Sequence, residues 1–158
     1  MRLTIYTDYA LRLLMYLAVK HDGLVTIAEV SQSYGISKNH MMKVAHQLGL
    51  AGYVEAVRGR SGGLRLARPA EEISVGEVVR RTEQDMALVP CLQEGDTSCV
   101  IRPCCALKRA LAQATSAFIA VLDGYSLGDL VQPRAPLIKF LDIEPVPRQR
   151  ARGERARA

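Results

Sequence analysis

Four cysteines lie close together in the chain, at Cys91, Cys99, Cys104 and Cys105. No C-x-x-C pair occurs among them, which disfavours a thioredoxin-like dithiol and a zinc ribbon. If Cys104 and Cys105 open a helix, their side chains point about 100° apart and are not expected to face one small cluster together. Three thiolates and one further ligand would suit an iron–sulfur cluster, with the fourth cysteine to spare. A structural zinc site and plain structural cysteines are the alternatives.

A second group of side chains is suited to reading DNA. Lys and Asn can pair with guanine and adenine edges in the major groove, and Ser37 is better placed for a phosphate. The glycine-rich loop over 58–63 can bring arginines to the DNA backbone or into a narrow minor groove. The candidate DNA contacts are Ser37, Lys38, Asn39, His40, Lys43, Arg58, Arg60, Ser61 and Arg65.

The charge distribution supports a nucleic-acid partner better than the total does. The 158 residues carry a formal net charge of +5. Residues 37–68 alone carry six basic and one acidic side chain, residues 148–158 carry five and one, and the stretch over 69–147 is net acidic. Segregation of this kind favours double-stranded DNA as partner, although a charged helix face can also be merely solvated.

Local signals predict the elements that would position these residues. Apolar residues at helical spacing predict a helix over 8–21, and a capping box from Thr26 to Glu29 opens a second helix that ends at Gly35. A third helix follows from Ser37 to about Leu50, then two short strands over 53–57 and 64–68. The pattern predicts a winged helix-turn-helix domain over 1–82, with the helix-turn-helix at about 26–50 and the wing at about 53–68. The fold class is mainly α with a small β-wing.

The remainder of the chain predicts a loop, a long helix and a tail. Ser74 and Glu77 predict a second capping box, for a helix that ends near Thr82. Residues 83–105 are predicted to form an irregular cysteine-bearing loop. Pro103 fits the first position of a long helix that ends near Asp123. Its apolar seam predicts homodimerisation, in a dimerisation and packing segment over 103–141 before a basic tail over 142–158 expected to be disordered. The seam comprises Leu107, Leu111, Ala114, Phe118 and Val121.

No segment suits a membrane or a secretory signal. The longest uncharged run, over 110–122, is well below the roughly 20 residues of a membrane-spanning helix. Asp8 and Arg12 interrupt the apolar residues near the N-terminus, so no secretory apolar region forms. We therefore expect a cytoplasmic protein with no membrane partner.

Several motifs together resemble the bacterial family of iron–sulfur winged-helix regulators that includes NsrR and IscR, and they look closest to its NsrR branch. The resemblance runs from Leu3 to about Leu141. The motifs are Thr7-Asp8-Tyr9-Ala10-Leu11-Arg12, Ser37-Lys38-Asn39-His40-Met41, Ala51-Gly52-Tyr53-Val54, Val57-Arg58-Gly59-Arg60-Ser61-Gly62-Gly63, Cys99-Val100-Ile101-Arg102-Pro103-Cys104-Cys105 and Leu122-Asp123-Gly124-Tyr125-Ser126-Leu127.

The resemblance implies a DNA-binding repressor that senses nitric oxide, and not an enzyme. It implies a [4Fe-4S] cluster, or alternatively [2Fe-2S], held by Cys91, Cys99, Cys105 and, from the partner subunit, Asp8. Two features depart from the family. Lys108 stands where the IscR branch has a histidine, and the seven residues between the first two cysteines exceed the usual NsrR spacing. The alternatives are an IscR-like sensor of iron or iron–sulfur supply, a zinc-stabilised DNA-binding protein, and a thiol redox or cluster-carrier protein.

Overall fold

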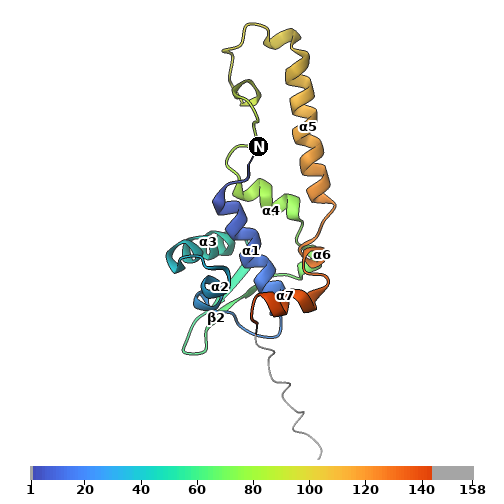
Figure 1. Cartoon of the computed structure of the whole chain (residues 1–158). Helices are drawn as coiled ribbons and strands as arrows, with labels where there is room; N and C mark the ends of the chain where they lie inside the picture. Colours follow the sequence, from blue (N-terminus) through green and yellow to red (C-terminus); the bar gives the residue numbers. More distant parts are fainter. Residues whose placement is uncertain (1, 144–158) are drawn as a thin grey trace, which may run out of the picture.

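The computed structural model describes residues 2–143. Figure 1 shows a group of helices around a small hairpin, with α5 and the cysteine-bearing loop standing away from it as an arm. Most of the expected tail, from residue 144 onward, lies outside the described residues. None of the described helices is both long enough and apolar enough to cross a membrane.

Helix α1 (Ile5–Val19) runs through the centre of the core. It begins three residues earlier than predicted, because the Thr4 hydroxyl accepts a hydrogen bond from the Thr7 backbone N–H at 3.2 Å and caps the helix there. Ala10, Leu13 and Leu14 are fully buried, and most of this hydrophobic core lies among α1, the next two helices and the hairpin.

Helices α2 (Ile27–Tyr34) and α3 (Lys38–Leu50) form where the local signals predict them. The capping box between Thr26 and Glu29 is complete, and Gly35 adopts a φ of 65° that a side chain would strain. Ser37 caps α3 by accepting a hydrogen bond from the His40 N–H at 3.3 Å. The helix-turn-helix is therefore set by residues adjacent to it in sequence.

The wing is an antiparallel hairpin of β1 (Val54–Val57) and β2 (Gly63–Leu66), with Val54 opposite Leu66. Val25 extends it by exchanging two backbone hydrogen bonds with Leu64, of 2.9 and 2.7 Å. A Cβ on Gly63 would lie 2.9 Å from the Val25 carbonyl oxygen, so this close approach requires glycine.

Helix α4 (Val75–Thr82) starts at Ser74 as expected, but the second capping box is only half formed. Ser74 accepts from the Glu77 N–H at 3.3 Å, whereas the Glu77 carboxylate turns away to Tyr53 and Arg68. Because these partners come from the wing, a local sequence motif does not reveal them.

The long helix α5 (Ala106–Asp123) starts later than the proline suggested. Pro103 lies in a 3₁₀ turn (Arg102–Cys104), and Cys105 is the residue that caps α5. The argument that Cys104 and Cys105 diverge on a helix start therefore loses its premise, since neither lies within α5. Other 3₁₀ turns span Ala70–Glu72 and Pro90–Leu92.

Helices α6 (Leu127–Leu130) and α7 (Arg134–Phe140) return the chain to the winged-helix unit. Leu141 and Ile143 are buried, and the Ser33 hydroxyl donates to the Leu141 carbonyl oxygen at 2.9 Å. The packed segment therefore extends to Ile143, two residues into the range expected as tail.

Candidate functional site

The first half of α3 exposes the side chains proposed to read DNA. Lys38, Asn39, His40 and Lys43 are all exposed, whereas Met41 is fully buried against the core. The apolar face of α3 thus fixes the helix on the domain and leaves donors and acceptors facing solvent. This is the arrangement a recognition helix needs to enter a major groove.

His40 also has a contact that the sequence did not indicate. Its ring lies beside that of Tyr9, with the ring centroids 6.1 Å apart. Tyr9 follows Asp8 on α1, so this aromatic contact joins α3 to the segment that carries the expected partner-subunit ligand. Nothing in the local pattern of either helix signals a contact between residues so far apart in the chain.

The wing presents two kinds of arginine. Arg58, Arg60 and Ser61 are exposed around a turn in which Gly59 has a φ of 121°. Arg65 instead faces Glu55 across the hairpin, with its Nε 2.9 Å and its Nη2 2.8 Å from Oε2 of that carboxylate. Arg65 therefore has a partner already, whereas the structure gives Arg58 and Arg60 no ion pair within residues 2–143.

We predict a different effect for the two arginines. Arg60→Ala should weaken operator binding by about 1–3 kcal/mol if the side chain contacts a base edge. Arg65→Ala should cost less, because the Arg65 guanidinium is already engaged in hydrogen bonds to Glu55. Operator titrations of both variants at one salt concentration check this, and an unchanged affinity in Arg60→Ala would contradict the assignment of Arg60 to the DNA surface.

The four cysteines are free thiols in and beside the loop over 83–105. Cys91, Cys99 and Cys105 are partly buried and Cys104 is exposed. The Cys105 sulfur accepts a hydrogen bond from the Lys108 N–H at 3.4 Å, at the N-terminus of α5. The Cys104 thiol donates a hydrogen bond to the Ile101 carbonyl oxygen, also at 3.4 Å. Cys105 is thus the one of the pair that is held as an acceptor.

The thiols fit an iron–sulfur cluster in chemistry but are not assembled around a site. Among residues 2–143, no three His, Cys, Asp or Glu side chains are grouped closely enough to hold a metal ion. Unpaired thiolates are the ligands such clusters require. Completing a site from Cys91, Cys99 and Cys105 would require the loop to rearrange.

Asp8 lies in the first turn of α1 as a half-exposed carboxylate. It forms an ion pair with Arg12 at 2.9 Å, and the Arg12 guanidinium also lies 5.6 Å from the Tyr34 ring centroid. One turn earlier, the Thr4 N–H donates to Glu83 Oε1 at 2.7 Å. The start of α1 is therefore attached to the first residue of the cysteine loop of its own chain.

Helix α5 buries none of its residues within the chain. On the predicted seam, Leu107 and Val121 are 66% and 62% exposed, Ala114 is exposed, and Leu111 and Phe118 are partly covered. An apolar seam of this length left open to solvent is typical of a helix that packs on another subunit.

Comparison with known proteins identifies the family. The model of the Rrf2 family, described as an iron-dependent transcriptional regulator, matches residues 3–133. The chain belongs to the Rrf2 family. It is 48% identical over 145 residues to the HTH-type transcriptional regulator NsrR of Bacillus subtilis, covering 91% of this chain and 99% of that one. The resemblance to the NsrR branch is thereby confirmed, and the chain is a transcriptional regulator of this family.

Solved structures confirm the fold class. The chain superposes on CymR, the global cysteine regulator of B. subtilis, with a TM-score of 0.68 and 24% identity, over 82% of this chain and 95% of that one. It superposes on IscR of T. potens with a TM-score of 0.67 and 23% identity, over 87% and 90% of the two chains. At these identities the likeness establishes the winged-helix Rrf2 fold alone.

Proposed function

We propose that this Rrf2 regulator is a homodimeric repressor that binds operator DNA in the cytoplasm and releases it when nitric oxide attacks an iron–sulfur cluster. The observation that carries the proposal is the set of four free thiols in and beside the loop over 83–105, with Cys105 at the N-terminus of α5, in a chain 48% identical to a regulator named NsrR. Its regulated genes would serve defence against nitric oxide and nitrosative stress.

Cys91, Cys99 and Cys105 are the proposed thiolate ligands, and Asp8 of the partner subunit is the proposed fourth. The expected cluster is [4Fe-4S], with [2Fe-2S] as the alternative; when bound, it supplies iron that nitric oxide can attack. Asp8 must exchange its Arg12 partner, 2.9 Å away, for the ligand position. Because Tyr9 lies next to Asp8 and its ring contacts that of His40, such an exchange acts close to α3.

The DNA-binding surface combines α3 and the wing. We propose Lys38, Asn39, His40 and Lys43 as groove contacts and Ser37 as a phosphate contact. Arg58, Arg60 and Ser61 approach the DNA from the wing, with Arg65 as a further candidate. Two such units on a twofold axis would meet half-sites about 34 Å apart. The open seam of α5 supplies the surface that would join them.

One second function is favoured by a specific observation. The family model describes an iron-dependent regulator, which also suits a sensor of iron or iron–sulfur supply. That function would use the same thiols and the same DNA surface. It differs in its signal, since operator binding would follow cluster assembly and not nitric oxide.

Purification without oxygen tests the cluster directly. The protein should absorb in the visible range and contain iron and acid-labile sulfide. A colourless protein with one zinc ion per chain would contradict the proposal and favour a structural zinc site.

A further inference from the structure

Helix α4 lies where the arm meets the winged-helix unit. The Val75 N–H donates to the Tyr125 carbonyl oxygen at 2.9 Å, just beyond the end of α5. A Cβ on Gly76 would lie 2.1 Å from Oδ1 of Asp123 and 2.9 Å from its backbone nitrogen. The first turn of α4 and the last turn of α5 are therefore packed too closely for any side chain at position 76.

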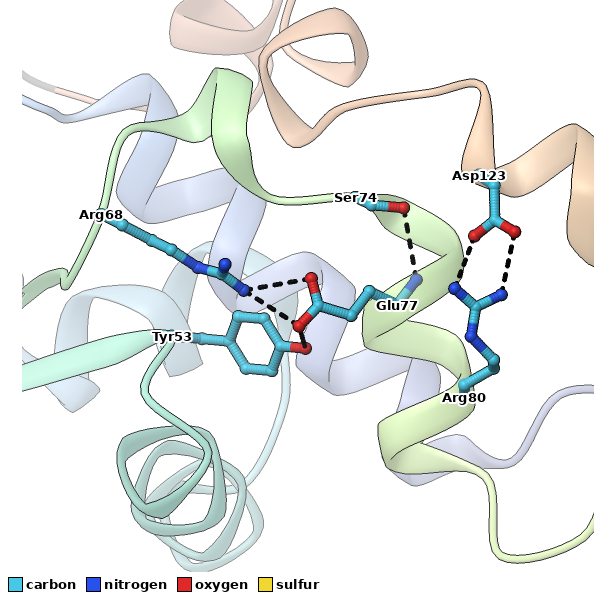
Figure 2. A network of polar contacts seen from close by, with 6 residues as sticks. All are labelled: Tyr53, Arg68, Ser74, Glu77, Arg80 and Asp123. Carbon is cyan, nitrogen blue, oxygen red and sulfur yellow. Dashed lines mark hydrogen bonds and ion pairs between the residues drawn. The ribbon is translucent and has the colours of Figure 1, made fainter.

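Arg80 donates two parallel hydrogen bonds to Asp123, the last residue of α5. Its Nη1 lies 3.0 Å from Oδ2 of Asp123 and its Nη2 lies 2.7 Å from Oδ1 (Figure 2). This contact lowers the pKa of the Asp123 carboxyl group. A surface ion pair adds little stability, but bidentate geometry fixes the orientation of the two groups.

Glu77 holds the wing from the same helix. Its carboxylate accepts a hydrogen bond from the Tyr53 hydroxyl at 2.9 Å and two from Nη2 of Arg68, at 3.1 and 3.2 Å. The Arg68 guanidinium carbon also lies 5.0 Å from the Tyr53 ring centroid. Burial, followed by the Glu77 contact, raises the pKa of Tyr53 to about 12. Tyr53 precedes β1 and Arg68 follows β2, so one carboxylate ties together both ends of the hairpin.

We propose that Glu77 and Arg80 are positioning residues through which α4 couples the arm to the wing. They lie three residues apart on one helix of eight residues, so a displacement of the arm at Asp123 moves the carboxylate that anchors the wing. The inference deepens the proposed function and rests on it, because it supplies a route from the cysteine-bearing arm to the DNA surface. It differs from the shorter route through α1, in which Tyr9 acts on His40.

Hydrogen exchange of the wing tests the coupling without DNA or nitric oxide. In the full-length protein, Arg80→Gln should speed hydrogen exchange of the β1 and β2 amides by about fivefold or more. The reason is that the contact between Arg80 and the arm no longer opposes local opening of the hairpin. Arg81→Gln is the matched control, because Arg81 is exposed, adjacent, and has no ion pair among the described residues. Glu77→Gln should have the same effect as Arg80→Gln.

A charge swap separates positioning from simple loss of stability. The Arg80→Asp and Asp123→Arg variants should each speed wing exchange, and the double variant should restore it towards the wild-type rate. If only Glu77→Gln changes wing exchange, or if Arg80→Gln and Arg81→Gln behave alike, the hold on the wing is local and the inference is wrong.

Operator binding then ties the coupling to the signal. We expect the wild-type ratio of operator affinities before and after nitric oxide to fall by about fivefold or more in Arg80→Gln, with an unchanged cluster spectrum. An unchanged ratio in that variant would contradict the coupling. If the wild-type protein itself does not respond to nitric oxide, the proposed function fails, and the exchange measurement still decides the inference.

Discussion

The Cys105→Ser variant should fail to assemble the cluster, whereas Cys104→Ala should assemble it normally. Serine is a favoured N-cap residue, so the hydroxyl can replace the sulfur that accepts from Lys108 and α5 should still begin at Ala106. The variant therefore removes the proposed sulfur ligand without removing the cap. Cys104 is exposed and its thiol donates a hydrogen bond to the Ile101 carbonyl oxygen, and it lies outside the expected ligand set.

Iron and sulfide content with the visible spectrum measure the outcome for both variants. We expect Cys105→Ser to lose essentially all bound iron and, with it, the response of operator binding to nitric oxide. Circular dichroism should show the same helix content in both proteins. A colourless Cys104→Ala variant beside a coloured Cys105→Ser variant would place the third ligand one residue earlier.

The Val121→Glu variant should convert the protein to a monomer. The Val121 side chain is 62% exposed in the single chain, so a carboxylate there costs the fold little. It would be costly only where the seam is buried against a partner, because an unpaired charge would then lose its water. Operator affinity should fall towards the non-specific level, on the order of 10³-fold, since the single winged-helix unit of a monomer contacts only one half-site.

Ala120→Glu is the matched control for this variant. Ala120 is the preceding residue on α5 and is also exposed, but helical geometry turns it about 100° away from the seam. Sedimentation should show a dimer for Ala120→Glu and a monomer for Val121→Glu. A dimer in both would contradict the assignment of the seam.

Local signals predicted those parts of the fold that neighbouring residues determine. Three local features formed as expected and position α3: the Thr26 capping box, the left-handed Gly35 and the Ser37 cap. The acidic Glu77 was misjudged in part, because Tyr53 and Arg68 compete for its carboxylate from across the domain. Propensity and spacing describe what a residue can do nearby, and they do not rank partners brought in by tertiary packing.

The site shows the same division between local and long-range determinants. Exposure of Lys38, Asn39 and His40 followed from the periodicity of α3, since Met41 and Val44 had to be buried. The pairing of Arg65 with Glu55 depends on hairpin register, and the contact between the Tyr9 and His40 rings depends on how α1 crosses α3. Among residues 2–143, the cysteines are not grouped closely enough to hold a metal ion.

A nitric oxide titration of the anaerobically purified protein on operator DNA tests the central claim most directly. The visible spectrum and the fraction of bound operator should be recorded on the same sample. We expect both to change together and to saturate at a fixed ratio of nitric oxide to cluster. Operator binding that persists after the cluster spectrum has been lost would contradict the claim that this regulator senses nitric oxide.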